Sequence, residues 1–283
     1  IGETMAATAY QIQYRSEFIS AFEQRQSMLS ASVTREAVIK GNQATFLVAG
    51  SGSATAVTRG VNGLIPARND DLNQYTATLV EWHDLVQRTG FNLFASQGDG
   101  RRIMQETTMG VINRKMDQDI LAELANATQD AGAAATMSLS KVMHALTILG
   151  NADVDITEAD KLFGVITPAA YGYMMQTKEF ASAEYVDVKP FSGPARKYLR
   201  WAGVNWIVHP NLTGAGTSAE ICYVFHKDAI GQAVNTGEMD MKVGVDEEQQ
   251  YSWARCSVFM GSKILQNTGI VKVTHDGSAY AAT

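Results

Sequence analysis

The chain has 283 residues, of which 46% are hydrophobic and 18% charged, and its formal net charge is −6 at pH 7. This is a globular composition with slightly few charges, which suits a surface that is buried against partners. No run of Lys or Arg is longer than the pair Arg101–Arg102. The acidic balance and the lack of a basic patch therefore exclude a surface for tight nucleic-acid binding.

The cysteine content argues against a disulfide scaffold. Cys222 and Cys256 are the only cysteines, and no CxxC pair occurs, so we expect two reduced thiols in a cytoplasmic setting. No apolar run reaches the roughly 18 residues that would span a bilayer. The first residues also lack the basic and apolar regions of a signal peptide. We therefore expect no contact with a membrane.

The N-terminal residues predict a thin amphipathic helix. Tyr14, Phe18 and Phe22 follow an i, i+4, i+8 spacing in an otherwise polar segment. So narrow an apolar stripe needs a surface outside itself. We therefore expect residues 5–30 to form an arm that lies on another surface.

The next segment combines two strands with a long polar excursion. Two β-rich runs flank Gly41–Asn42, which predicts a hairpin or a tight turn. The strand "ATFLVAG" is followed by "GSGSATAVTRGVNGLIPARNDD", residues 50–71, and then by "QYTATLVEW". Neither face of this last strand is cleanly apolar, which fits a β-ribbon projecting from the body or an ordinary edge hairpin. Structureless loops longer than about 12–15 residues are uncommon and usually functional or disordered.

Residues 96–128 predict the strongest helix. Ile112, Met116, Ile120 and Leu124 repeat every four positions, so one side of the helix packs on a sheet. At about 1.5 Å per residue, a helix of about 28 residues within this segment would be about 42 Å long. The charged side chains between them are expected to face elsewhere; these are Arg114, Lys115, Asp117, Asp119 and Glu123.

The remaining residues mix helices and strands. Residues 138–151 predict a helix, and residues 162–166 a buried strand that leads into a helix with Thr167 as N-cap and Pro168 in its first turn. Strands follow around Gly203 and at residues 251–277, and "EICYVFHKDAIGQAV" predicts a buried strand that enters a short helix. Because these elements lack a strict βαβ rhythm, the fold class is α+β.

No constellation for catalysis or metal binding emerges from the sequence. Cys222 and His226 lie in a predicted strand, about 13 Å apart at about 3.3 Å per residue, which is too far for a nucleophile and its base. The acidic run "DVDITEAD" lacks the Gly of a calcium loop, and no phosphate-binding glycine motif occurs. We therefore expect no catalytic, cofactor-binding or metal-binding residues, and a protein that is not an enzyme.

The order of these parts resembles the major capsid protein of tailed bacteriophages, whose fold is shared with encapsulins and herpesvirus shell proteins. "SVTREAVIKGNQATFLVAG" looks like the segment that enters the extended loop of short-tailed-phage capsid proteins. "FGVITPAAYGYMMQ", "GVNWIVHPNLTG" and "CYVFHKDAIGQA" are similar to the strands and turns of the axial domain. The resemblance covers essentially the whole chain.

The resemblance implies the Hong Kong-97-type capsid fold in five parts. These are an N-terminal arm at 1–40, an extended β-hairpin loop at 41–95, a peripheral domain with the spine helix at 96–135, an axial domain at 136–250 and strands returning to the peripheral domain at 251–283. The implied function is self-assembly, through hexamers and pentamers, into an icosahedral shell around a double-stranded DNA genome. The implied partners are further copies, scaffolding and portal proteins and a possible cementing protein. Assembly is expected in the host cytoplasm.

Some relatives crosslink the shell through a Lys in the extended loop, but no Lys lies between Lys40 and Lys115 here. We therefore expect a non-covalent shell. The predicted inter-subunit contacts are Arg59, Leu64, Ile65, Arg68, Arg88, Phe18 and Phe22. Two alternatives remain open at this point: an encapsulin-type nanocompartment shell, and a soluble α+β enzyme whose site escapes notice.

Overall fold

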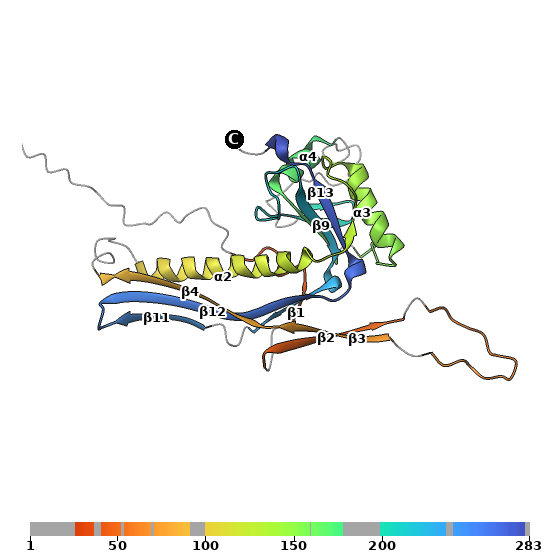
Figure 1. Ribbon diagram of the computed structural model, residues 1–283, viewed down its shortest axis with the longest axis horizontal. Coiled ribbons are helices and arrows are strands. Elements are labelled where there is room, and N and C mark those ends of the chain that lie inside the picture. The colour runs from red at the N-terminus through yellow and green to blue at the C-terminus, as the bar shows by residue number, and fades with distance from the viewer. Residues whose placement is uncertain are drawn as a thin grey trace, which may run out of the picture.

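The computed structural model describes residues 26–36, 41–51, 54–68, 71–90, 100–158, 160–177, 199–235 and 240–280. A long helix lies on a narrow sheet, a lobe of helices and strands rises at one end of that helix, and a two-stranded ribbon extends beyond it (Figure 1). The mixture of helices and mostly antiparallel strands confirms the α+β prediction.

The long helix α2, Gly100–Leu124, lies along a five-stranded sheet (Figure 1). Every fourth residue from Met104 to Leu124 is buried, so the predicted stripe is confirmed and extends further toward the N-terminal end of the helix. Ile112 and Met116 pack against Cys256, Val258 and Met260 of the sheet. Residues 91–99, where we predicted that the helix begins, lie outside the described residues.

The centre of this sheet is the 14-residue strand β12, Tyr251–Ile264, which has neighbouring strands along both edges. One edge carries β4, Val80–Thr89, over the stretch from Tyr251 to Met260. The other edge carries β11, Asp240–Asp246, and then β10, Ile230–Val234. The short strand β1, Thr34–Glu36, adds to β10 in parallel.

The lobe is built on a six-stranded sheet with the order β5, β13, β9, β6, β8, β7. Its strands are Gln129–Asp130, Ile270–His275, Glu220–His226, Leu162–Ile166, Val204–Val208 and Leu199–Trp201. Helices α3, Leu139–Asn151, and α4, Pro168–Gln176, pack on one face. The other face packs on the end of α2 and on Leu29 and Val33. Single 3-10 turns lie at Lys227–Ala229, Asn267–Gly269 and Ser278–Tyr280.

Local signals in the lobe are confirmed. The Thr167 hydroxyl accepts the Ala170 N–H at 3.1 Å, Pro168 opens α4, and all five residues of the preceding β6 are buried. Strands β7 and β8 are joined by Ala202 and Gly203, both with positive φ, as a tight two-residue hairpin requires. The predicted "short helix" after β9 is only the 3-10 turn Lys227–Ala229.

The ribbon consists of β2, Gln43–Gly50, and β3, Asp71–Thr78, paired over their whole length. The hairpin alternative at Gly41–Asn42 is wrong, because β1 pairs with β10 and β2 pairs with β3. Gly41 has φ +97°, which fits the tight-turn alternative. The predicted strand at 74–82 is split at Leu79: its first half joins the ribbon, and its second half, in β4, joins the five-stranded sheet.

The five-part domain division stays a prediction. The last predicted part, residues 251–283, contains two strands with different neighbours. Strand β12 lies beside α2, whereas β13 pairs with β9 in the lobe. Similarly, β4 falls within the predicted extended-loop range but pairs with β12 along ten residues. We therefore use "extended loop" below for residues 43–78, the part outside both larger sheets.

Candidate functional site

The base of the extended loop is seated on β10. Ala44 and Ala77 are buried against Ala233, and the Phe46 ring lies over Gly231, where an added Cβ would come within 2.9 Å of the ring. The main chain at Thr78 passes equally close to Gly261 of β12, where an added Cβ would lie 2.2 Å from the Thr78 carbonyl oxygen. The side chains of the base therefore fix the direction in which the loop leaves the body.

Beyond this base, the loop exposes apolar side chains. Leu47 is 77% exposed and Leu72 68% exposed, and their pairing partners place both on one face of the ribbon. Six of the fourteen large hydrophobic side chains that the described part of the chain exposes lie in the loop; they are Leu47, Val57, Val61, Leu64, Ile65 and Leu72. So dense an apolar set on a projecting element indicates a contact surface.

The tip of the loop is a turn that closes on itself. Gly60 N–H donates to the Leu64 carbonyl at 3.0 Å, and Gly63 N–H donates to the Gly60 carbonyl at 2.8 Å, with Gly63 at φ +71°. This turn holds Val61, Leu64 and Ile65 outward, so the two predicted contact residues of the tip, Leu64 and Ile65, are both exposed.

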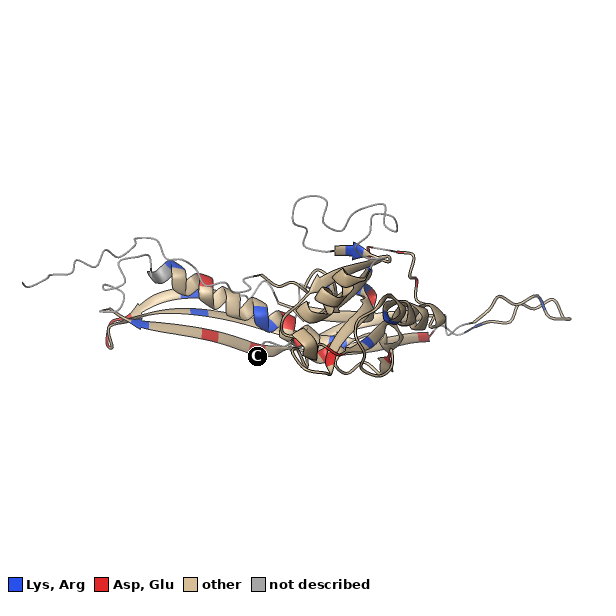
Figure 2. Ribbon diagram, turned by 90° about the horizontal axis from the view of Figure 1, so that it is seen from above, with Lys and Arg blue, Asp and Glu red and all other residues tan. Residues whose placement is uncertain are grey.

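The loop is also nearly free of charge. Among residues 43–78 the only charged side chains are Arg59, Arg68, Asp70 and Asp71, and Figure 2 shows the projecting loop as almost entirely uncharged ribbon. Arg68 Nη1 donates to the Ser51 carbonyl at 3.1 Å. This hydrogen bond links the residue after β2 to the segment that precedes β3. Arg59 is exposed.

The predicted contact residues do not all come together. Arg88 lies near the end of β4 opposite Ser252, at the end of the sheet away from the extended loop (Figure 1). It therefore cannot act jointly with Arg59 and Arg68 of the same chain. Phe18 and Phe22 lie outside the described residues.

A buried junction that the sequence did not reveal ties the first described residues to α2. The Asp117 carboxylate is fully buried and accepts the Ser27 hydroxyl at 2.5 Å and the Met28 and Leu29 N–H groups at 3.0 and 3.2 Å. On its other side His209 Nε2 lies 3.5 Å from Oδ2. The prediction that Asp117 faces away from the packed side is therefore wrong.

The sequence held a signal for this junction. Asp117 lies four positions before Leu121, which is buried beside the main stripe, so the packed side of α2 widens toward its end. Burial alone would raise the pKa of the Asp117 carboxyl. The close contact with His209 and the hydrogen bonds from Ser27 and the two backbone N–H groups outweigh burial and hold that pKa below its usual value.

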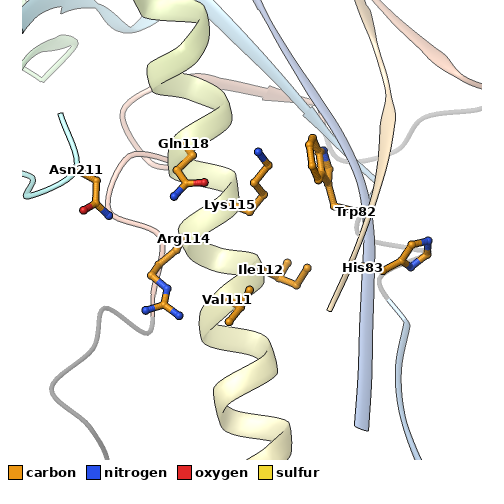
Figure 3. A pocket seen from close by; sticks show the side chains of 8 residues that line it. All are labelled: Trp82, His83, Val111, Ile112, Arg114, Lys115, Gln118 and Asn211. Atoms are coloured by element: carbon orange, nitrogen blue, oxygen red, sulfur yellow. The ribbon is translucent and has the colours of Figure 1, made fainter. Parts of the chain in front are cut away.

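A hollow of about 450 Å³ is lined by residues of α2 and β4 and by Asn211 of the loop after β8. Figure 3 shows Lys115 and Ile112 reaching from α2 toward Trp82 of β4, and Arg114 and Gln118 on the side nearer Asn211. The Lys115 ammonium lies 3.8 Å from the centre of the Trp82 ring, a cation–π contact. The hollow thus combines apolar and cationic walls.

The candidate reactive side chains Cys222 and His226 serve in packing. Cys222 and His226 both belong to β9, as predicted, and burial raises the pKa of the Cys222 thiol to about 12, so the thiol is protonated near neutral pH. Within the described ranges no group of three or more His, Cys, Asp and Glu side chains could hold a metal ion. No described helix is long and apolar enough to cross a membrane.

A second buried polar cluster holds the last strand in the lobe. Glu220 accepts hydrogen bonds from the Thr167 hydroxyl and from Gly216 N–H at 2.7 Å. Lys141 donates to the carbonyls of Ala133, at 2.9 Å, and of Thr274. These contacts satisfy main-chain and carboxylate groups inside the lobe, so their role is structural.

Solved structures that share this arrangement come from phages and from a GTA particle. The chain superposes on a structure of Mycobacterium phage Che8 with a TM-score of 0.73 at 14% identity, covering 92% of this chain and 95% of that one. The capsid of a native GTA particle gives 0.69 at 13%, covering 96% and 97%. The capsid of Ralstonia phage GP4 gives 0.66 at 12%, covering 98% of each chain. At these identities the likeness establishes the fold, which is that of tailed-phage major capsid proteins.

The family follows from the sequence itself. The model of the phage capsid protein family matches residues 6–277, and the chain therefore belongs to that family. It is a structural shell protein, as the resemblance implied. A comparison with curated protein sequences gave no match.

Proposed function

We propose that many copies of this chain form hexamers and pentamers of an icosahedral shell that encloses double-stranded DNA. The observation that carries this proposal is the extended loop, whose exposed apolar side chains have no surface to cover within the described chain. A neighbouring copy supplies such a surface in every subunit of a symmetric assembly, so one contact is repeated throughout the shell. The formal charge of −6 suits a container that does not grip its contents.

The contact that we propose runs through the loop tip and the exposed ribbon face. Leu64 and Ile65 would dock on the neighbour, where burying each side chain stabilises the contact by about 1.5–3 kcal/mol. Arg59 and Arg68 would pair with carboxylates around this contact, and Arg88 would act at a separate contact at the far end of β4. Each of these ion pairs, at a partly exposed rim, adds at most about 1 kcal/mol.

The loop-tip contact is tested by Leu64→Asp with Asn62→Asp as the matched control. Both substitutions place one negative charge in the turn at 60–64, but only the first removes an exposed apolar side chain. Electron microscopy of the expressed protein should show particles for the unchanged chain and for Asn62→Asp, and dispersed subunits for Leu64→Asp. Normal particles from Leu64→Asp would refute the loop-tip contact.

We further propose assembly in the host cytoplasm with scaffolding and portal proteins, and a shell held without covalent crosslinks, with or without a cementing protein. Nucleic acid in purified particles would distinguish a viral shell from a compartment that stores enzymes. Particles from infected cells that lacked DNA at every stage of infection would contradict the proposed genome container.

A further inference from the structure

We propose that Asn62, at the tip of the extended loop, is a site of spontaneous deamidation, which converts it to aspartate or isoaspartate. The reaction is intramolecular apart from water, so it takes place in the single subunit and does not depend on the shell. Its consequence for docking of the loop tip rests on the proposed function.

The sequence around Asn62 favours this reaction. Asn62 is the only asparagine of the chain that is followed by glycine. Deamidation begins when the side-chain Cγ of an asparagine meets the main-chain nitrogen of the next residue, and a Cβ on that residue hinders the approach. Glycine has no Cβ and adopts a wide range of backbone conformations. The link between Asn62 and Gly63 is therefore the one in this chain at which the ring closes most readily.

The fold presents this link without cover. The bond from Gly63 N–H to the Gly60 carbonyl closes a turn with Val61 and Asn62 at its centre, and Gly63 follows with φ +71°. This is the form of a three-residue hairpin loop that ends in a left-handed glycine. Asn62 is exposed, and its side-chain amide has no hydrogen-bond partner within the described residues. Apart from the adjoining residues, no described atom would lie within 4 Å of a Cβ added at Gly63, so the ring has room to form.

One contact opposes the reaction. The attacking nitrogen belongs to the Gly63 N–H that donates to the Gly60 carbonyl at 2.8 Å, so this bond must open before the ring closes. In the described part of the chain the turn is held only by its own main-chain bonds, and such local opening is frequent. The net strength of one hydrogen bond lowers the open population by about tenfold at most. The free subunit should therefore deamidate no more than about tenfold more slowly than an isolated peptide of residues 60–68.

The reaction balances with water as the only co-reactant. The Gly63 nitrogen attacks the Asn62 Cγ, a C–N bond forms, and the Cγ–Nδ2 bond breaks, so that ammonia leaves with the proton from Gly63. Water then adds to the succinimide ring and breaks one of its two C–N bonds. Cleavage at Cγ gives aspartate. Cleavage at the main-chain carbonyl gives isoaspartate, in which the chain runs through Cβ and Cγ.

The two products differ in their effect on the loop tip. Aspartate adds only a charge, as Asn62→Asp does, and should still dock. Isoaspartate lengthens the main chain by one carbon between residues 62 and 63. Both bonds of the turn, from Gly63 to Gly60 and from Gly60 to Leu64, span this link. Leu64 and Ile65 are then no longer held in the same position, so subunits with isoaspartate should fail to dock.

The modification is tested on the unassembled full chain, kept at neutral pH in water enriched in oxygen-18 and then digested briefly with trypsin in ordinary water. Cleavage after Arg59 and Arg68 gives the peptide 60–68, in which OH with a heavy oxygen should replace the amide NH2. Asn42 is exposed but followed by glutamine, so it should stay unchanged in the peptide 41–59. No conversion of Asn62 over about ten half-lives of the synthetic peptide, or equal conversion of Asn42, would overturn the site.

The consequence for docking is tested by letting an aged stock assemble. An isoaspartyl methyltransferase labels isoaspartate selectively, so its share can be compared between particles and stock. Isoaspartate should be depleted about tenfold or more in particles, because at least one apolar side chain loses its contact, whereas aspartate at position 62 should not be depleted. Asn62→Gln cannot close a five-membered ring, so it should assemble equally well before and after ageing. Equal isoaspartate shares would overturn the effect on docking, while particle formation by fresh chains reports separately on the proposed function.

Discussion

Replacing Asp117 by Asn should destabilise the subunit more than any comparable change on the exposed side of α2. The carboxylate accepts three hydrogen bonds from residues 27–29 and faces His209 Nε2. His209 Nδ1 accepts the Asn211 N–H at 3.2 Å, so its proton lies on Nε2, the nitrogen that is 3.5 Å from Asp117 Oδ2. An amide of the same shape keeps one acceptor oxygen and turns an NH2 group toward the remaining donors.

The magnitude follows from the groups left without an acceptor. With the amide oxygen at the Oδ1 position, Ser27 and Leu29 keep their bonds, whereas Met28 N–H and His209 Nε2 face a donor. Each unsatisfied buried donor costs about 1–3 kcal/mol, and loss of the ionised acceptor weakens the bonds that remain. We therefore expect Asp117→Asn to lower the free energy of unfolding by about 3 kcal/mol at neutral pH.

The same contact gives the effect a pH dependence of known sign. The pKa of Asp117 is lower in the folded than in the unfolded chain, so the ionised carboxylate stabilises the folded chain above the ordinary pKa of 3.8. That contribution is lost as the pH falls below 3.8 toward the folded pKa. The deficit of Asp117→Asn should therefore shrink on acidification.

The control is Asp119→Asn on the same helix. Asp119 also binds a serine, Ser262, at 2.5 Å, but burial raises its pKa, so its contribution is greatest at low pH and is lost as the pH rises through that pKa. Urea unfolding of the unassembled chain, followed by tryptophan fluorescence at pH 7 and at about pH 3, below the ordinary pKa of 3.8, measures both variants. A cost for Asp117→Asn no larger than that for Asp119→Asn, or one that grows on acidification, would refute the account of the junction.

Three further outcomes are expected. Particles boiled in denaturant should run as monomer on a gel because residues 41–114 contain no Lys; a ladder of covalent oligomers would contradict this. Gly261→Ala should lower the free energy of unfolding by about 1–3 kcal/mol, since its Cβ would lie 2.2 Å from the Thr78 carbonyl oxygen; an unchanged urea midpoint would disprove this clash. Lys141→Met should lower the thermal midpoint by several degrees because the carbonyls of Ala133 and Thr274 lose their donor; a matched Lys272→Met should not.

Most elements of the fold could be predicted from local patterns in the sequence. Three predictions that depend only on neighbours in sequence are confirmed. They are the buried residue at every fourth position of α2, the Thr167–Pro168 start of α4 and the apolar strand at 162–166. Strand pairing depends on distant residues. Strand β1 pairs with β10, almost 200 positions away, and no local sequence pattern favours β10 over the nearby β2 as its partner.

The candidate site was predictable only in part, for the same reason. Leu64 and Ile65 stand out in a polar loop, so their exposure could be expected. The spacing of Asp117 to Leu121 could have indicated that Asp117 is buried, but its neighbours Ser27 and His209 lie 90 and 92 positions away, so no local pattern predicts these contacts. The hollow likewise joins β4, α2 and the loop after β8, which no segment of the sequence brings together.

The extended loop separates two tasks along its length. At the base, Gly231 and Gly261 allow contacts so close that even one methyl group would force a shift, so β10 and β12 set the direction of the ribbon. At the tip, the turn at 60–64 is held only by its own main-chain bonds, and its apolar side chains point outward. In the proposed shell, a rigid base with an adaptable tip would let one chain make the same contact in hexamers and pentamers. The angle between neighbours would then change through the exposed residues at 54–60 while the proposed docking residues stay the same.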